Sequence, residues 1–412
     1  MQIRDLVIEL LVAEPGIKAF PVGSPVGSFQ QDRIATDRGS CSFVGFPLFD
    51  LGMFYSVPGS RLKRLVRLLF VVHSYAKEVL ACVASFPMRD VLFGLRHGFA
   101  ADRVYLYGRK GVLSGTYLSD FQRQLSRFIN PKPARELLED KLLFADLAGQ
   151  YVAVPTNYLY ACNRRSVVLC DEWAAIASSQ NPDERVPLVL KRARGGGGTD
   201  FRVLEMRQGA VHWGGKAMSL PDFYRRFAQH DEFLICEFIK QCDFCRKIYP
   251  HTTNTVRLIC MRDHEGEPFV ARAILRLGSR RSDGVDNFGQ GGLAADVNLE
   301  TGMLGIAVEH DTSAPRAPKN YSQHPDSGTQ IRGEVLPNWN IAKEASLKLM
   351  RQLPFINYVG WDIVLTDTRP VFLEGNNYTG IRLAQIHSGL LSDDRMRDFY
   401  MRYGILRSDR VA

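Results

Sequence analysis

The chain has 412 residues, of which 45% are hydrophobic and 23% charged, the balance of an ordinary soluble globular protein. Its length exceeds that of one typical domain, so we expect two or three lobes. Lys and Arg outnumber Asp and Glu by 52 to 44, and the net charge of +8 favours anionic ligands without choosing among them. No apolar run of about 20 residues occurs, which argues against a membrane span.

The first residues lack the basic start and clean apolar core of a secretory signal, because Glu9 and Glu14 interrupt the apolar segment. We therefore expect a cytoplasmic protein. The eight cysteines are scattered irregularly, unlike a disulfide framework. Cys242 and Cys245 have C-x-x-C spacing, but no second pair or suitably spaced histidine accompanies them, so we expect packed thiols rather than zinc.

The predicted elements begin after a segment, residues 1–60, whose frequent Gly, Ser and Pro predict a loop-rich structure. Residues 61–86 have the apolar spacing of an amphipathic helix, and two further helical patterns between 120 and 147 are separated by the prolines of 130–133. The predicted core side of the first helix consists of Leu62, Leu65, Leu68, Leu69 and Val72.

Short strands dominate the rest of the chain. They begin at 151–155 and 186–190, and tight turns join successive strands directly over 186–280. This pattern predicts antiparallel pairing within an α+β fold. Helical periodicity returns around 342–353 and near the C-terminus.

A run of four glycines follows one of these strands, with Lys191 just upstream. Glycine lets backbone N–H groups close over a phosphate without interference from a Cβ atom, and the lysine adds a positive charge. No Gly-Lys-Ser/Thr follows, so the run is not a Walker loop. A flexible hairpin tip or linker is the alternative interpretation. The glycines are Gly195, Gly196, Gly197 and Gly198.

Two strand patterns, 360–365 and 371–376, predict a β-hairpin. A turn centred on Thr368 places Asp362 opposite Glu374, with Asn376 on the same face. Like charges about 4.5 to 5.5 Å apart repel, so we expect a cation between them. Two carboxylates and an amide suit Mg²⁺, although solvated carboxylates on a hairpin edge are the alternative.

Three arginines lie on the two preceding strand patterns. Arg257 belongs to 255–261, and Arg272 and Arg276 share one face of 271–277 with Ile274. Forked guanidinium groups suit phosphate or carboxylate, while solvated arginines at a sheet edge are the alternative. The opposite face of the second strand is predicted to carry Ala271, Ala273, Leu275 and Leu277.

Together, over residues 102–390, these features resemble the ATP-grasp superfamily, and more closely its sugar-transfer-associated branch. The resemblance implies an ATP-grasp fold of α+β class. In that fold a helical region, 61–150, precedes a smaller lobe with a glycine-rich flap, 151–240, and a larger lobe with a metal site, 241–412. The matching motifs are Tyr107-Gly108, Asp140-Lys-Leu-Leu-Phe144, Lys191 with its glycines, Ile235-Cys-Glu-Phe-Ile239, Asn254-Thr-Val-Arg257, residues 285–292, His324-Pro325, Gly360-Trp-Asp362 and Leu373-Glu-Gly-Asn376.

The resemblance also implies a role for each candidate residue in binding ATP, Mg²⁺ or an acceptor. Lys141, Lys191 and the glycine run are expected to bind the ATP phosphates. The hinge residues Glu237, Phe238 and Ile239 are expected to bind adenine. The nearest acid to the hinge, Asp243, is the candidate for binding the ribose. Asp362, Glu374 and Asn376 are expected to bind Mg²⁺. Arg257, Arg272 and Arg276 are candidates for binding the γ-phosphate or the acceptor. Arg382 is a candidate for binding an acceptor carboxylate, and the alternative is an ordinary surface arginine.

The implied activity is ATP-dependent ligation of a carboxylate to an amine through an acyl phosphate, forming a C–N bond and ADP. The acceptor could be an amino acid, a peptide or a uronic-acid-bearing glycan intermediate, the last by analogy with the branch's name. The expected setting is cell-surface polysaccharide or peptide-type metabolite biosynthesis. An ATP-dependent kinase acting on a sugar or polyol could use the same site, and a nucleotide-binding protein without catalysis is a third possibility. We expect no nucleic acid partner.

Overall fold

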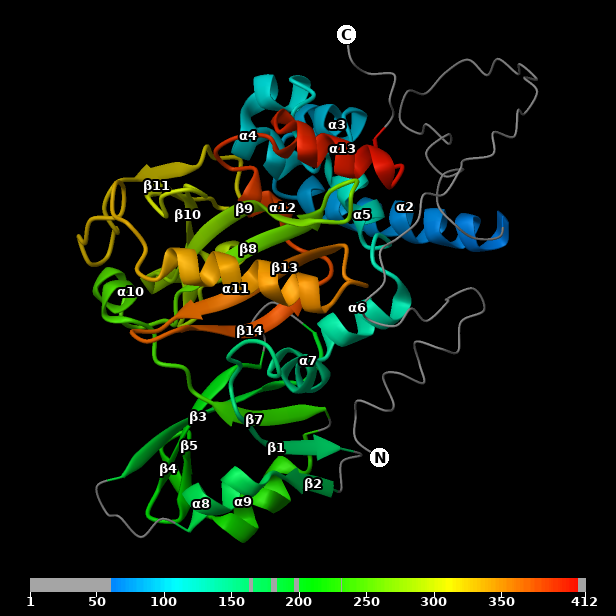
Figure 1. Cartoon of the computed structure of the whole chain (residues 1–412). Helices are drawn as coiled ribbons and strands as arrows, with labels where there is room; N and C mark the ends of the chain where they lie inside the picture. The colour runs from blue at the N-terminus through cyan, green and yellow to red at the C-terminus, as the bar shows by residue number, and fades with distance from the viewer. Residues whose placement is uncertain (1–60, 163–165, 179–183, 196–199, 231, 407–412) are drawn as a thin grey trace.

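The computed structural model describes residues 61–162, 166–178, 184–195, 200–230 and 232–406. Within them, helices are followed by a smaller and then a larger lobe, each built on a seven-stranded antiparallel sheet (Figure 1). The predicted loop-rich segment 1–60 and Gly196, Gly197 and Gly198 lie outside the described residues. Among the described residues, no helix is both long and apolar enough to cross a membrane.

The N-terminal helical region begins with a long amphipathic helix whose buried side differs from the predicted one. Val71, Tyr75 and Val79 are buried at four-residue spacing, whereas Leu65 and Leu69 are 51% and 60% exposed. The helix has apolar residues on more than one side, so its spacing alone did not identify the packed side. The helices are α2 (Arg61–Val83), α3 (Met88–Arg96), α4 (Ala101–Leu113), α5 (Asp120–Ser126), α6 (Lys132–Glu139) and α7 (Lys141–Ala148).

The break predicted at 130–133 separates α5 from α6, with Pro131 at the N-cap of α6. The strand predicted at 151–155 is wrong. Ala153 instead makes a single bridge to Val371, and its carbonyl accepts from the N–H of Phe372 at 2.8 Å. A tight turn after α7 leaves too little extended chain here for a ladder.

The smaller sheet has the strand order β2-β1-β7-β3-β4-β5-β6. One face packs on two helices through Trp173, Phe223 and Phe227. Leu188 and Leu190 of β3 point into that core, and Val189 between them points to the opposite face. The elements are β1 (Asn157–Cys162), β2 (Ser166–Leu169), α8 (Asp171–Ala177), β3 (Arg185–Arg192), β4 (Arg202–Arg207), β5 (Ala210–Trp213), β6 (Lys216–Ser219), α9 (Leu220–Phe227) and β7 (Phe233–Glu237).

The larger sheet has the strand order β12-β11-β10-β9-β8-β13-β14. Its elements are α10 (Asp243–Ile248), β8 (Thr255–Arg262), β9 (Pro268–Leu277), the 3-10 helices η2 (Arg280–Ser282) and η3 (Phe288–Gln290), β10 (Leu293–Val297), β11 (Leu304–Glu309), β12 (Lys319–Tyr321), α11 (Trp339–Gln352), β13 (Tyr358–Leu365), β14 (Pro370–Asn376), α12 (Ile381–Ala384), η4 (Leu390–Ser392) and α13 (Asp394–Arg402).

Helices cover both faces of the larger sheet (Figure 1). Trp361 on one face packs in the same cluster as residues of α11, and Tyr358 on the other packs with α2 and α13. Ala271 belongs to the cluster of Ile274, not to that of Leu275 as predicted. A register shift between Ile259 and Cys260 of β8 interrupts the alternation on β9 at that point.

Candidate functional site

The β13–β14 hairpin brings the three predicted metal ligands together. Asp362 pairs with Glu374 across the two strands. Leu373 has no partner, because the register shifts by one residue between the site half and the turn half of the hairpin. Asn376 donates from Nδ2 to Asp362 Oδ2 and to Glu374 Oε1, at 3.4 Å each. The three side chains therefore converge.

Two arginines of neighbouring strands hold the Asp362 carboxylate. Arg257 donates to one oxygen from Nη2 at 2.7 Å and to the other from Nε. Arg276 donates from Nη1 to Oδ2 at 3.0 Å. Burial by itself raises the pKa of Asp362, but the two guanidinium charges outweigh that effect and hold the pKa below its ordinary value. Asp362 is therefore an anion fixed from two sides.

Asp286 extends this row of alternating charges, and the sequence did not identify it as a site residue. Arg276 donates from Nη2 to Asp286 Oδ1 at 2.7 Å, and the Thr255 hydroxyl donates to Oδ2. Burial raises the pKa of Asp286 against the opposing influence of Arg276. In the sequence, only the position of Asp286 within the motif at 285–292 pointed to a role in the site. Asp286 lies in a loop, so strand alternation could not predict which residues it contacts.

Lys141 connects the start of the glycine run with the hairpin. The backbone N–H of Lys141 donates to the carbonyl of Ala193 at 2.9 Å, which fixes the start of α7 against the end of β3. From there Nζ donates to the carbonyl of Gly195 at 2.8 Å and lies 3.2 Å from Glu374 Oε2. One ammonium group thus contacts both lobes.

Lys191 lies on β3 beside a small apolar cluster. Val189, Leu234 and Cys236 form this cluster on the face of the smaller sheet opposite α8 and α9, and Phe238 packs against it. Burial raises the pKa of the Cys236 thiol, and the nearby Lys191 acts to lower it. An apolar surface beside a lysine suits a nucleotide base next to its phosphates.

The predicted hinge residues lie at the C-terminal end of β7. Glu237 is the last residue of the strand, and its carboxylate accepts from the N–H of Thr156 at 3.2 Å. Phe238 and Ile239 follow outside the strand, and Phe238 borders the apolar cluster beside Lys191. The hinge backbone therefore lies at the edge of the surface that would receive a base.

Three predicted residues lie away from the charge row. Arg272 donates to Ser388 Oγ at 3.4 Å. Asp243 forms an exposed ion pair with Arg246 at 2.7 Å. Arg382 lies on α12, and its ion-pair partner belongs to the N-terminal helical region.

The donor set at the hairpin fits a hard divalent cation. Asp362 and Glu374 supply carboxylate oxygens, and Asn376 has an amide oxygen that a rotation of its side chain would present. Among the described residues, no three or more His, Cys, Asp or Glu side chains converge as a metal site. A metal ion bound at the hairpin would therefore need the amide oxygen of Asn376 and oxygens from a bound phosphate, in addition to the two carboxylates.

Three solved structures resemble parts of the chain at low identity. An ADP complex of N5-carboxyaminoimidazole ribonucleotide synthetase is 12% identical, with a TM-score of 0.34, over 60% of this chain and 46% of that one. The biotin carboxylase domain of the Hydrogenobacter thermophilus 2-oxoglutarate carboxylase is 14% identical, with a TM-score of 0.38, over 69% and 49%. D-alanine–D-alanine ligase from Bacillus anthracis is 14% identical, with a TM-score of 0.34, over 65% and 69%.

The chain thus spans less than half of the synthetase and about half of the carboxylase domain. No curated protein matches the sequence. A family model described as sugar-transfer associated ATP-grasp matches residues 120–397, more than half of the chain. That match contains Lys141, the glycine run, the charge row and the hairpin. The chain therefore belongs to the sugar-transfer associated ATP-grasp family and has the ATP-grasp fold.

Proposed function

We propose that the protein is an ATP-dependent carboxylate-amine ligase that works through an acyl phosphate. The observation that carries the proposal is the row of alternating charges formed by Asp286, Arg276, Asp362 and Arg257, with Lys141 bridging from Glu374 to Gly195. Such an array of fixed charges beside a glycine-rich segment suits a polyphosphate. The supporting comparison is membership of an ATP-grasp family.

In this proposal Mg-ATP lies between the two lobes. Lys141, Lys191 and the glycine run bind the phosphates, and the backbone at Phe238 and Ile239 binds adenine, with Glu237 securing the hinge. Asp243 remains the candidate for the ribose. Asp362, Glu374 and Asn376 would hold Mg²⁺, which neutralises charge on the phosphates when bound.

The chain's own contribution to the reaction is positioning and charge. Arg257 and Arg276 are fixed by Asp362 and Asp286, so their donors need no rearrangement when negative charge develops on the transferred phosphoryl group. The substrate carboxylate attacks the γ-phosphate, the bond to the oxygen that bridges the β- and γ-phosphates breaks, and ADP leaves. An amine then displaces phosphate from the acyl phosphate. Arg272 is a further candidate for contact with the acceptor. The biosynthetic setting, a cytoplasmic location and lobe boundaries at 60, 150 and 240 remain predictions.

The test is ADP release from Mg-ATP over pooled carboxylates and amines, by the wild type, Asp362→Asn and Lys191→Met. Asp394→Asn serves as the control, because that aspartate is 86% exposed on α13. We expect turnover in the wild type and the control and a loss in the other two. Equal turnover by all four proteins would refute the site assignment. Product analysis tests the reaction, since ligation gives free phosphate and an amide, whereas a kinase leaves phosphate on the acceptor.

A further inference from the structure

The N-terminal helices α2 and α3 carry most of the large apolar side chains that the protein exposes. Of the thirteen such residues in the described part of the chain, eight lie on these two helices. The other five are divided among α4 and the two lobes. A concentration of this kind marks an interaction site. The eight residues are Leu65, Val66, Leu69, Phe70, Leu80, Val83, Met88 and Leu92.

The exposed apolar residues of α2 lie on one side of that helix. The side that contains Val71 and Tyr75 is buried. Because an α-helix has 3.6 residues per turn, Val66, Leu69 and Leu80 project from the opposite side. The helix is therefore apolar on a side that faces away from the protein.

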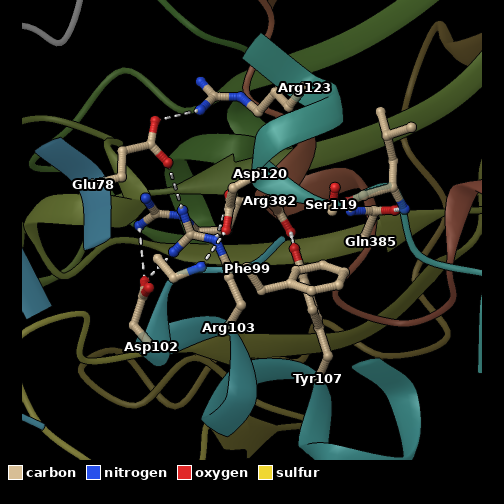
Figure 2. A network of polar contacts seen from close by, with 12 residues as sticks. Glu78, Phe99, Asp102, Arg103, Tyr107, Ser119, Asp120, Arg123, Arg382 and Gln385 are labelled. Carbon is tan, nitrogen blue, oxygen red and sulfur yellow. Dashed lines mark hydrogen bonds and ion pairs between the residues drawn. The ribbon is translucent and has the colours of Figure 1, made fainter. Parts of the chain in front are cut away.

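The two acids of α2 and α3 are both engaged with arginines of neighbouring helices. Glu78 pairs with Arg123 at 3.3 Å and lies 3.9 Å from Arg103, within a polar network that ties α2 to α4 and α5 (Figure 2). Asp90 is 3% exposed, and its carboxylate accepts a hydrogen bond from Arg109. Both negative charges are therefore balanced inside the protein.

Positive charge remains on the outer side of the two helices. Arg89 is 81% exposed and lies 3.7 Å from the buried Asp90, and Lys77 and Arg96 are exposed as well. Positive charge therefore predominates on this surface, which favours an anionic partner. The basic residues between 64 and 96 are Arg64, Arg67, Lys77, Arg89 and Arg96.

Two arginines also meet at one aromatic ring beside α2. The guanidinium of Arg67 lies 5.3 Å from the centre of the Phe128 ring, and that of Arg135 lies 5.8 Å from the same centre. Burial and the positive charge of Arg135 lower the pKa of Arg67. Among the described residues, the buried Nε atoms of Arg64 and Arg135 have no hydrogen-bond partner. A bound anion would balance these charges and accept from these donors.

A hollow of about 810 Å³ lies between α3 and α4. Arginines of both helices line it, Arg89 and Arg96 from α3 and Arg109 from α4. Leu92 also lines the hollow and is one of the exposed apolar residues. The positively charged hollow is therefore continuous with the apolar surface, and its volume is in the range of small-molecule sites.

We propose that α2 and α3 bind a membrane surface that contains anionic lipids. The helices lie in the plane of the surface, with their apolar side chains between the headgroups and the acyl chains. The basic side chains pair with lipid phosphates, and the hollow between α3 and α4 receives one headgroup. This occupant matches both properties of the surface, whereas a nucleic acid supplies negative charge without an apolar phase.

The proposed membrane surface is separate from the proposed ATP site. α2 and α3 lie towards the end of the molecule opposite the smaller lobe (Figure 1). The residues proposed to bind ATP, Mg²⁺ or an acceptor belong to other elements. Membrane binding therefore goes beyond the ligase function and is tested without turnover.

The first experiment is sedimentation of the full chain with sucrose-loaded vesicles. One set of vesicles contains phosphatidylcholine alone, and the other contains equal parts of phosphatidylcholine and phosphatidylglycerol. We expect the protein to sediment with the anionic vesicles and not with the neutral ones, and to be released as the salt concentration is raised. Binding to neither set, or equal binding to both, overturns the proposal.

The double variant Leu65→Ser with Leu69→Ser tests the apolar contribution. Both side chains are more than half exposed, so they contribute little to the core. We expect binding to anionic vesicles to weaken at least tenfold. The matched control is Val335→Ser with Ile341→Ser, which removes apolar side chains of similar exposure from the larger lobe. Unchanged binding by the first pair, or an equal loss in the control, overturns the proposal.

The double variant Arg89→Gln with Arg96→Gln tests the basic residues of the hollow. We expect binding to anionic vesicles to weaken about 30-fold, because two charges that act close to the lipid phosphates are lost. The matched control is Arg225→Gln with Arg351→Gln, whose side chains are 74% and 52% exposed elsewhere on the protein. Equal binding by the wild type and the first pair overturns the role of the hollow.

Hydrogen–deuterium exchange locates the contact without any substitution. On anionic vesicles, amide exchange should slow within residues 64–96 and stay unchanged in the smaller lobe. Slower exchange confined to other elements overturns the assignment. Unchanged melting temperatures and unchanged binding of an ATP analogue show that the variants are folded. If vesicles do not bind and Leu65→Ser with Leu69→Ser instead dissociates a dimer seen by light scattering, the surface joins two copies and the membrane assignment fails.

Discussion

The ammonium group of Lys141 lies 3.2 Å from the carboxylate of Glu374. The same group donates to the Gly195 carbonyl, so it connects the first residue of the glycine run with the metal strand. Glu374 belongs to β14 of the larger sheet, and Gly195 follows β3 of the smaller sheet, so one ammonium group contacts both lobes. Lys141 therefore offers a direct test of the interlobe site.

Lys141→Met keeps the length of the side chain but removes its charge. We expect the Kd for a fluorescent ATP analogue to rise at least tenfold with Mg²⁺ present, because a phosphate-binding cation is lost. The matched control is Lys132→Met, since Lys132 on α6 is 68% exposed and pairs with Glu136 of its own helix. An unchanged Kd for Lys141→Met, measured by titration, would contradict the assignment.

Asp286→Asn removes the charge that fixes Arg276 from the side opposite Asp362. We expect kcat to fall by about 100-fold, because a small displacement of a positioned cation has an effect of this size. Binding of the ATP analogue should change little, so the effect should appear in kcat rather than in nucleotide affinity. Steady-state kinetics beside titration separates the two quantities. A large loss of nucleotide affinity would instead assign the Asp286–Arg276 pair to ATP binding and contradict this prediction.

Asp140→Ala removes the N-cap of α7. The Asp140 carboxylate accepts from the N–H groups of Leu142 and Leu143 at 3.0 and 3.2 Å and pairs with Arg194 at 2.9 Å. We expect the free energy of unfolding to fall by about 1 to 2 kcal/mol, mostly from the lost cap. Asp140→Asn retains a capping oxygen and should lose much less. Urea denaturation of the three proteins measures the difference, and equal losses by both variants would rule out the cap as the cause.

His324 makes the stability of the larger lobe sensitive to acid. Nε2 is 2.9 Å from the carbonyl of Gly278, and Nδ1 accepts from the N–H of Asp326 at 3.2 Å, an arrangement that requires a neutral ring. Burial lowers the pKa of His324 below its ordinary value of 6.5. The stability it contributes is therefore complete above pH 6.5 and is lost as the pH falls through the lower, folded-state pKa.

His324→Gln keeps one donor and one acceptor without a titrating ring. We expect its melting temperature to decline less between pH 7.5 and pH 5 than that of the wild type, as measured by calorimetry at both pH values. Parallel declines would show that other groups dominate the acid sensitivity.

The hairpin could be predicted from sequence because its pairing is local. Asp362 and Glu374 flank one turn, and the alternation of strand side chains is enough to place them opposite each other. The turn occupies residues 366–369, so its centre lies just before Thr368, and the register shift at Leu373 compensates for the difference. The predicted pairing was correct, although the bulge was not foreseen.

The charge row could not be predicted because its contacts are distant in sequence. Arg257 and Asp362 are 105 residues apart, and no local pattern places β8 beside β13. The same limit applies to His310, which the sequence presents as one histidine after a strand. Its burial, and the absence of a hydrogen-bond partner for its ring among the described residues, follow from the three-dimensional fold and not from a local sequence pattern.

The unpaired Leu373 sets the phase of β14. Phe372 lies in the apolar cluster with Trp361, and strict alternation along the strand would send Glu374 into that same cluster. The bulge absorbs one residue, so the carboxylate emerges beside Asp362 instead. The bulge therefore lets one strand place Phe372 in the apolar core and Glu374, two residues later, at the charged site on the opposite face.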